Sequence, residues 1–248
     1  MHGSTVVITG ASSGIGAAVA VELARRGASL GLIARRRPAL ETVAARCGDR
    51  ALAITADVTE RAQVRRAIEE TLRRFGAIDV WINNAGRGIT RLPSQLTDED
   101  LDEMMRVNVK SALYGMQEIL PHFGERSRGH LINVSSMLGR IPSSLPRSAY
   151  NGAKHFLNAL TANFGAELLA SHPGIRVSLV SPGVVWTEFG RNALHGGPDS
   201  RALPDGQEPA EVARVIAELI EHPRPDVYTR PGAHDRVVTY FDTLASDP

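Results

Sequence analysis

Tyr150 and Lys154 stand four positions apart in the segment YNGAK (150–154), and on a helix this spacing places both side chains on one face. A phenol titrates near pH 10, and a nearby ammonium that stabilises the phenolate would lower its pKa. Ser136 follows a predicted strand in NVSS (133–136), and its hydroxyl can hydrogen-bond a substrate oxygen on which charge develops. The three residues predict proton transfer at a carbonyl or alcohol oxygen, although a Tyr and a Lys four apart also occur by chance as an exposed helix pair.

A glycine-rich turn precedes this group by more than a hundred residues. The segment TGASSGIG (9–16) follows the apolar run Val6-Val7-Ile8 and opens a stretch whose apolar residues, Ile15 and Leu23 among them, have helical spacing. Glycines at a strand-to-helix turn let the backbone approach phosphate oxygens, and the free N–H groups of the first helical turn attract an anion. The segment predicts a binding site for the pyrophosphate of a dinucleotide. A plain Gly/Ser-rich turn is the alternative interpretation.

The end of the second predicted strand bears on the choice of dinucleotide. An acidic residue at this place accepts hydrogen bonds from the adenosine ribose, whereas an arginine accommodates a 2′-phosphate. Ala34 stands at the acidic position, and Arg35 follows it with a planar donor fork suited to phosphate. NADP(H) is therefore favoured over NAD(H). We interpret Arg36 and Arg37 as a solvated basic corner before the next helix.

The elements that must position these residues alternate between short β-branched runs and longer amphipathic segments, which predicts an α/β fold of Rossmann type. We expect a doubly wound parallel sheet of about seven strands with helices on both faces, in one domain over 1–248. The Gly/Pro-rich segment 190–209 interrupts the alternation and is predicted to be a substrate lid. The predicted strands span residues 5–9, 29–34, 51–55, 79–82, 130–135, 175–180 and 227–229.

Apolar residues at helical spacing predict which helix faces meet the sheet. The two clearest stripes are Val64, Ile68, Leu72 and Phe75, and Phe156, Leu160, Phe164 and Leu168. The helices near 107–120 and 150–168 carry additional apolar residues, which predicts a subunit interface in a homotetramer or homodimer. These additional residues are Val109, Leu113, Met116, Leu157, Leu160 and Phe164.

Composition narrows the class of protein further. The 28 basic and 27 acidic residues give a net charge of +1, which offers no broad footprint for nucleic acid or an anionic membrane. The single cysteine, Cys47, excludes an internal disulfide, and we expect a cytoplasmic protein. The eight histidines lack paired metal-ligand spacing, so no metal site is predicted. Asp98, Glu99 and Asp100 follow Thr97 and are interpreted as helix-capping residues.

Together these motifs resemble the short-chain dehydrogenase/reductase family, in its single-domain branch of about 250 residues. The resemblance covers essentially the whole chain. TGASSGIG (9–16) is similar to the family's cofactor loop, Asp57 in ADV (56–58) to its adenine contact, and NNAG (83–86) to its signature after the fourth strand. Asn108 in VNV (107–109) is similar to an active-site asparagine that helps hold a water between the lysine and solvent. PGVVWT (182–187) resembles the segment over the nicotinamide, where Thr187 would bond the carboxamide.

The resemblance implies two overlapping sets of site residues. The catalytic set is Asn108, Ser136, Tyr150 and Lys154. The cofactor-binding set is Gly10, Ser12, Ser13, Gly14, Ile15, Gly16, Arg35, Asp57, Val58, Asn84, Ala85, Gly86, Tyr150, Lys154, Pro182, Gly183, Val185 and Thr187.

Two departures from the family pattern affect this transfer. The stretch from Ser136 to Tyr150 is one residue longer than the commonest family spacing, which leaves Ser135 as a second candidate for the catalytic serine. Ser136 is preferred because it stands three positions before Gly139. Ser13 occupies a position where many NADP-dependent members carry a basic residue, so Arg35 has less help in binding a phosphate.

The sequence thus predicts an NADP(H)-dependent oxidoreductase that interconverts a carbonyl and an alcohol, with Tyr150 as the proton donor or acceptor. A non-catalytic NADP(H) sensor or scaffold of the same fold is the alternative, and a nucleotide-sugar enzyme ranks below both. The pocket walls are expected to be residues 87–90, Leu138, the 140–148 loop and residues 186–189. They offer apolar surface with few charges, which favours a neutral, moderately hydrophobic small-molecule substrate.

Overall fold

A computed structural model describes residues 1–244 and contains a seven-stranded parallel sheet in the order β3-β2-β1-β4-β5-β6-β7. This is the Rossmann-like arrangement, in which the strand order reverses direction between β1 and β4. Each predicted strand is present, with bounds that differ from the prediction by at most one residue at either end. The strands are β1 (Thr5–Thr9), β2 (Ser29–Ala34), β3 (Ala51–Thr55), β4 (Val80–Asn83), β5 (Gly129–Val134), β6 (Ile175–Ser181) and β7 (Asp226–Tyr228).

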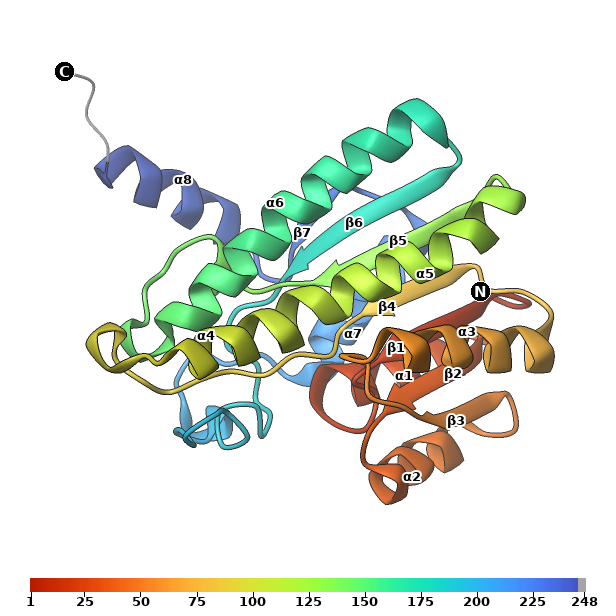
Figure 1. Ribbon diagram of the computed structural model, residues 1–248, viewed down its shortest axis with the longest axis horizontal. Helices are drawn as coiled ribbons and strands as arrows, with labels where there is room; N and C mark the ends of the chain where they lie inside the picture. The colour runs from red at the N-terminus through yellow and green to blue at the C-terminus, as the bar shows by residue number, and fades with distance from the viewer. Residues whose placement is uncertain (245–248) are drawn as a thin grey trace.

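Helices cover both faces of the sheet, as Figure 1 shows with α5 and α6 in front of it and α1 and α7 behind. The helix α8 extends away from this layered body at the C-terminal end. The helices are α1 (Gly14–Arg25), α2 (Arg37–Cys47), α3 (Arg61–Phe75), α4 (Asp98–Met105), α5 (Ser111–Glu125), α6 (Ser148–Ser171), α7 (Pro209–Glu221) and α8 (Ala233–Leu244), and a π-helical turn, Arg106–Lys110, joins α4 to α5.

Two hydrophobic cores lie on opposite faces of the sheet. Val6 and Ile8 of β1 point into the core under α1, α2 and α7, whereas Val7 points into the core under α3, α5 and α6. Every residue of β1 is buried, because successive side chains alternate between two covered faces. The continuous apolar runs that predicted the strands are a direct result of this double burial.

Buried amides fasten the middle of the sheet to the helices that carry the candidate site. The Asn83 side chain accepts a hydrogen bond from Trp81 Nε1 at 2.7 Å and donates to Asn133 Oδ1 at 2.9 Å. Asn133 in turn donates to Thr161 Oγ1 on α6 at 2.9 Å. Because buried polar groups cost free energy unless they are paired, this chain of bonds fixes α6 at one position relative to β4 and β5.

The predicted apolar stripe on α6 is wrong at its first member. Leu168 is buried and Leu160 and Phe164 are partly buried, but 51% of Phe156 is exposed. Positions four apart drift by about 40° around a helix of 3.6 residues per turn, so a row of four cannot stay on one face. The stripe on α3 is confirmed at Val64 and Ile68, which are both buried.

The predicted interface residues also differ from their expected place. Val109, Met116 and Leu157 are buried within the subunit, and Leu160 and Phe164 pack against the same core. The exposed apolar side chains of α6 are instead Phe156 and Leu169. The stripes on these helices have an intramolecular role, so they give no evidence for assembly.

Candidate active site

The turn between β1 and α1 forms the phosphate-facing part of the candidate site. Gly10 and Gly14 both adopt positive φ, +67° and +55°, which an L side chain rarely adopts. A Cβ at Gly10 would also lie 2.9 Å from Ala85 Cα, and one at Gly16 would collide with the Gly10 carbonyl. The turn therefore depends on glycine at these positions.

The first turn of α1 is suited to an anion. Its N-cap, Ser13, makes no side-chain capping bond, and of the residues described in this turn none is acidic. The backbone N–H groups from Gly14 to Gly16 thus point outward from a helix start that carries partial positive charge. Ile15 contributes its backbone to this turn, while its side chain packs against the core. These features fit the pyrophosphate of a dinucleotide.

Asn84 holds the glycine turn from the neighbouring strand. Its side-chain amide donates to the Thr9 carbonyl at 2.9 Å, and the Thr9 hydroxyl accepts hydrogen bonds from the backbone N–H groups of Asn84 and Ala85. The side chain of Asn84, predicted to contact cofactor, is thus already engaged with the protein backbone. Gly86 follows in an exposed position, where a Cβ would lie 2.9 Å from Asn108 Oδ1.

Charged groups gather where β2 and β3 end. Arg35 is exposed, and its Nη1 lies 3.9 Å from Asp57 Oδ2. Burial tends to raise the pKa of Asp57, but hydrogen bonds from Thr59 and the charges of Arg35 and Arg106 lower it overall. Val58, next in the chain, is buried in the core. An ionised carboxylate and an exposed guanidinium thus lie at the place expected for adenosine.

Arg36 is exposed, as the sequence predicts, but it also contacts the glycine turn. Its guanidinium donates to Ser13 Oγ at 3.0 Å and reaches Ser12 Oγ at 3.5 Å. The loop after β2 turns back over the glycine turn, so the side chain of Arg36 crosses to the start of α1. A basic group therefore stands next to Ser13, although position 13 itself has none.

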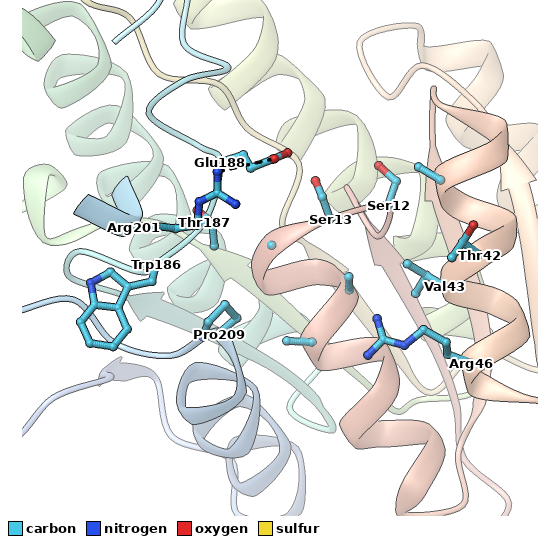
Figure 2. A pocket seen from close by; sticks show the side chains of 14 residues that line it. Ser12, Ser13, Thr42, Val43, Arg46, Trp186, Thr187, Glu188, Arg201 and Pro209 are labelled. Atoms are coloured by element: carbon cyan, nitrogen blue, oxygen red, sulfur yellow. Dashed lines mark ion pairs between the residues drawn. The ribbon is translucent and has the colours of Figure 1, made fainter. Parts of the chain in front are cut away.

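A cleft of about 580 Å³ opens beside this turn (Figure 2). Ser12, Ser13 and α2 line one side, and the segment 186–188 lines the other, with Thr187 facing the start of α1. Glu188 pairs with Arg201 across its rim at 3.9 Å. Thr187 also lies against Gly14, where a Cβ would meet its Cγ2 at 3.3 Å. The segment 182–187 thus approaches the glycine turn from the opposite side of the cleft.

The first residues of that segment are fixed by backbone contacts. The Pro182 carbonyl accepts a hydrogen bond from Met137 N at 2.7 Å, and Val185 is buried and forms a β-bridge with Gln207. Gly183 is half-buried with open space at its Cβ position. These contacts connect the segment to the loop that carries Ser136.

Tyr150 and Lys154 are both buried on the first turns of α6. Lys154 Nζ donates to the Val134 carbonyl at 3.0 Å and lies 5.8 Å from the centre of the Tyr150 ring. Burial raises the pKa of Tyr150 to about 12, against the opposing effects of Ser136 and Arg147. Burial also lowers the pKa of Lys154 to about 8. The predicted lowering of the phenol pKa is therefore not produced by the described residues alone, because desolvation of Tyr150 outweighs the Ser136 hydrogen bond and the charge of Arg147.

The structure distinguishes the two candidate serines. Ser135 is buried, and its hydroxyl donates a short hydrogen bond to Asn158 Oδ1. Asn158 in turn donates to the Gly139 carbonyl at 2.6 Å, so Ser135 belongs to a structural network. The Ser136 hydroxyl accepts a hydrogen bond from Leu138 N at 3.1 Å. Its side-chain hydrogen bonding with the Tyr150 phenol lowers the pKa of that phenol, against the effect of burial. Ser136 is thus the serine beside the tyrosine.

Asn108 occupies the π-helical turn between α4 and α5, and such turns are frequent at functional sites. Its amide nitrogen donates to the Arg87 carbonyl at 2.9 Å and the Met104 carbonyl at 3.1 Å, while its oxygen accepts from Arg87 N at 3.1 Å. Asn108 therefore fixes the loop that follows β4.

The predicted lid is attached to the rest of the molecule at several points, and it ends at Glu208, one residue before α7 starts at Pro209. Leu194 forms a β-bridge with Ile89. His195 Nε2 lies 2.6 Å from Asp100 Oδ1, and Asp100 also pairs with Arg91 at 2.9 Å. Asp100 does cap α4 through a capping box with Thr97, as expected, but its second partner, in the lid, is nearly a hundred residues away in the chain.

Two further site residues were not singled out from the sequence. The Phe189 ring packs against the Tyr150 ring, with 5.6 Å between ring centres. The guanidinium carbon of Arg147 lies 6.0 Å from the centre of the same Phe189 ring. Both lie in segments that were expected to wall the pocket, but no spacing pattern distinguishes them from their neighbours. Their contact depends on how two loops meet.

Other classes of site receive no support within residues 1–244. These residues contain no group of three or more His, Cys, Asp and Glu side chains placed to hold a metal ion. Among the same residues, no helix is both long and apolar enough to cross a membrane. Cys47 is a free, half-buried thiol whose pKa is raised by burial.

Comparison with known proteins places these features in context. A family profile described as short chain dehydrogenase matches residues 4–196. The hydroxynaphthalene reductase-like protein Arp2 of Metarhizium robertsii is 34% identical over 245 residues, which cover 90% of each chain.

Solved structures with the same fold include nucleotide complexes. A short chain dehydrogenase/reductase from Burkholderia phymatum in complex with NAD has a TM-score of 0.89 and 24% identity over 100% of this chain and 98% of its own. An alcohol dehydrogenase from Thermococcus sibiricus complexed with 5-hydroxy-NADP has a TM-score of 0.78 and 27% identity, over 91% of this chain and 95% of its own.

Proposed function

The chain belongs to the short-chain dehydrogenase family of oxidoreductases, and from that premise we propose that it interconverts a carbonyl and an alcohol with NADP(H). The observation that carries this proposal is the buried pair Tyr150 and Lys154, with Ser136 beside the phenol. The glycine turn of α1 and Thr187 would hold the dinucleotide. When bound, its nicotinamide supplies or accepts the hydride.

Tyr150 acts as the general acid in the reductive direction. Its pKa of about 12 keeps the phenol protonated at neutral pH, which is the form that can give a proton to a carbonyl oxygen. Ser136 donates a hydrogen bond to the same oxygen while negative charge develops on it. The burial of Tyr150 excludes bulk water from competing for this position.

Lys154 and Asn108 support the phenol. The Lys154 ammonium is held at the end of β5 by the Val134 carbonyl, where it stabilises the phenolate that forms after proton transfer. Asn108 fixes the backbone at Arg87 and so shapes the wall next to Lys154. The family resemblance further assigns it a water that connects the lysine to solvent.

The preference for NADP(H) over NAD(H) rests on two arginines. Ala34 cannot accept a hydrogen bond from the ribose, and Arg35 is exposed at the end of β2. Arg36 adds a second guanidinium at Ser13, where the sequence lacks a basic residue. Two guanidinium groups near the start of α1 favour the extra phosphate of NADP(H) through charge-assisted hydrogen bonds.

The proposal also covers localisation, domain organisation, partners and assembly. We assign the protein to the cytoplasm as one domain, with a small-molecule substrate, no nucleic-acid or membrane partner, and residues 190–208 as a substrate lid. The last four residues of the predicted domain, 245–248, lie outside the described residues. Exposed Phe156 and Leu169 on α6 support a homodimer or homotetramer formed through this helix.

A panel of ketones, aldehydes and secondary alcohols tests the proposal through the absorbance of reduced nicotinamide. Turnover with NADPH that exceeds turnover with NADH is expected for at least one carbonyl compound. Tight NADPH binding without any turnover would instead favour the non-catalytic sensor or scaffold.

A further inference from the structure

Buried polar atoms without a partner gather next to Tyr150. Within residues 1–244, five buried side-chain nitrogen or oxygen atoms have no hydrogen-bond partner. Four of them belong to Thr90 and to residues 147–151, and the fifth is in His130 on the sheet. Folded proteins leave few such atoms, so a cluster beside a proposed catalytic residue indicates that a ligand completes the hydrogen bonds.

Arg147 is the charged member of this cluster. Its Nη1 is covered and unpaired, and a side chain at Gly88 would collide with it. Burial lowers the pKa of the Arg147 guanidinium, and among the described residues Tyr150 is the titratable group whose charge opposes this effect. Arginine nevertheless stays protonated in proteins, so the charge persists without a counter-charge.

Neighbouring arginines show what is unusual about Arg147. Arg87 pairs with Glu103 at 3.5 Å, and Arg91 pairs with Asp100 at 2.9 Å. In the lid, Arg191 lies 3.8 Å from Asp199. Each of these three guanidinium groups has a carboxylate near it, whereas the guanidinium of Arg147, the one placed against the Tyr150 site, has an unpaired nitrogen.

Thr90 brings a second unpaired group to the same place. A Cβ at Gly197 would lie 2.7 Å from Thr90 Oγ1 and 3.6 Å from Arg147 Nη2, so the hydroxyl and the guanidinium flank one glycine of the lid. The Phe189 ring packs against the Tyr150 ring and against the Arg147 guanidinium. A phenol, an aromatic ring and two hydrogen-bond donors are thus gathered at one place.

We propose that Arg147 and Thr90 bind the carboxylate of the substrate, so that the carbonyl compounds reduced at Tyr150 are keto acids and the alcohols are hydroxy acids. This inference rests on the proposed function. A guanidinium matches a carboxylate through two parallel hydrogen bonds, and a hydroxyl can donate a third. Closure of the lid, which brings Gly197 against Thr90 and Arg147, excludes water and strengthens the pairing. The substrate is then anionic, in contrast to the neutral compound that the sequence favours.

Matched acids and esters provide the test. The probes are phenylglyoxylate, acetoacetate and levulinate, each measured beside its methyl ester with NADPH. For at least one pair, we expect wild-type kcat/KM for the acid to exceed that for the ester by roughly 10- to 100-fold, the value of a charge-assisted hydrogen bond. In Arg147→Met this ratio falls toward unity, and Arg147→Lys gives an intermediate ratio.

The ratio isolates the carboxylate from other effects of Arg147. Any change in the Tyr150 pKa alters acid and ester alike and cancels in the ratio. Arg191→Met is the matched control, because it removes a lid guanidinium that already faces Asp199, and its ratio should equal that of wild type. A wild-type ratio near unity, or a high ratio retained in Arg147→Met, overturns the assignment and leaves carbonyl reduction intact.

Stability provides a readout that does not depend on turnover. Because Arg147→Met removes a partly buried charge that has no carboxylate partner, Tm of the protein alone should rise by roughly 2–4 °C, whereas a fall would show that Arg147 has a structural role and overturn the proposal. If neither acids nor esters are reduced, the proposed function fails. Calorimetry with levulinate and methyl levulinate in the presence of NADP⁺ then decides the carboxylate site, and equal binding of the two overturns it.

Discussion

The two sides of the candidate site differ in how completely their polar groups are paired. Around the glycine turn, Thr9 and Asn84 bind each other's backbone, and Asp57 is held by Thr59. On the proposed substrate side, Thr90 and Arg147 retain buried atoms without partners. A paired network keeps its geometry whether or not a ligand is present, whereas an unpaired cluster is completed by one. The proposed cofactor side is thus preformed, whereas the proposed substrate side needs a ligand to complete its hydrogen bonds.

The largest expected effect is at the point where the two sides meet. Tyr150→Phe keeps the ring that packs on Phe189 but removes the proton donor, so kcat should fall by roughly 10²- to 10⁴-fold. The dissociation constant of NADPH, from fluorescence titration, should change little because the glycine turn is intact. Tyr228→Phe, on β7, is the matched control and should keep wild-type kcat. Carbonyl reduction that survives in Tyr150→Phe would refute the mechanism.

The cofactor side is tested by charge reversal. Arg35→Asp places an acid at the end of β2, which repels the 2′-phosphate and can accept bonds from the ribose of NADH. The ratio of kcat/KM for NADPH to that for NADH should fall roughly 10- to 100-fold, which steady-state kinetics with both nucleotides measures. Arg36→Ala should lower the ratio in the same direction by less.

Arg37→Ala is the control for these variants. Arg37 is exposed and paired with Glu41 at 2.7 Å, away from the glycine turn, so the ratio should not change. A wild-type protein that already prefers NADH would contradict the assignment of both Arg35 and Arg36.

The helix α6 carries the proposed catalytic pair, Tyr150 and Lys154, on one face and exposed Phe156 on another. If α6 forms the subunit interface, Phe156→Glu loses the roughly 1.5–3 kcal/mol of a buried aromatic side chain on each subunit. Light scattering over a dilution series should show dissociation at a higher concentration than in wild type. Phe241→Glu on α8 should leave the assembly unchanged, and a wild-type monomer at working concentration would exclude the interface altogether.

The smallest effect is expected in the lid. His195→Ala removes the contact with Asp100, and hydrogen exchange at residues 190–206 should accelerate by up to about tenfold. NADP(H) with substrate should slow exchange in the same residues of wild type, and unchanged protection would indicate a fixed loop. The pKa of Asp100 is lowered, chiefly by its hydrogen bond with His195. The stability that this hydrogen bond adds to the folded state is therefore present above the ordinary carboxyl pKa of 3.8, and it is lost as pH falls through the lower pKa of Asp100 in the folded protein.

Sequence reasoning performed unequally on the two sides, for a physical reason. The glycine-rich turn between β1 and α1 and the strand bounds depend on local spacing and on burial that the chain displays directly, and they were predicted to within one residue. The contact of Arg36 with Ser13 was not predicted, because it depends on the path of the short loop between β2 and α2. Arg147 and the pairing of His195 with Asp100 depend on loops that meet from distant parts of the chain, which no periodicity encodes.

The backbone closure at the base of the lid has a consequence for how this enzyme can be altered. Trp186 N donates to the Gln207 carbonyl and Gln207 N donates to the Val184 carbonyl, both at 2.9 Å, so the two ends of the loop meet beyond the end of β6. Gln207 is anchored further by two hydrogen bonds with Thr229. These hydrogen bonds close a loop of twenty residues, 187–206. Residues 190–206 can differ in length at little cost in entropy because the ends of the loop already meet, whereas Thr187 and Phe189 must be kept for their contacts with Gly14 and Tyr150.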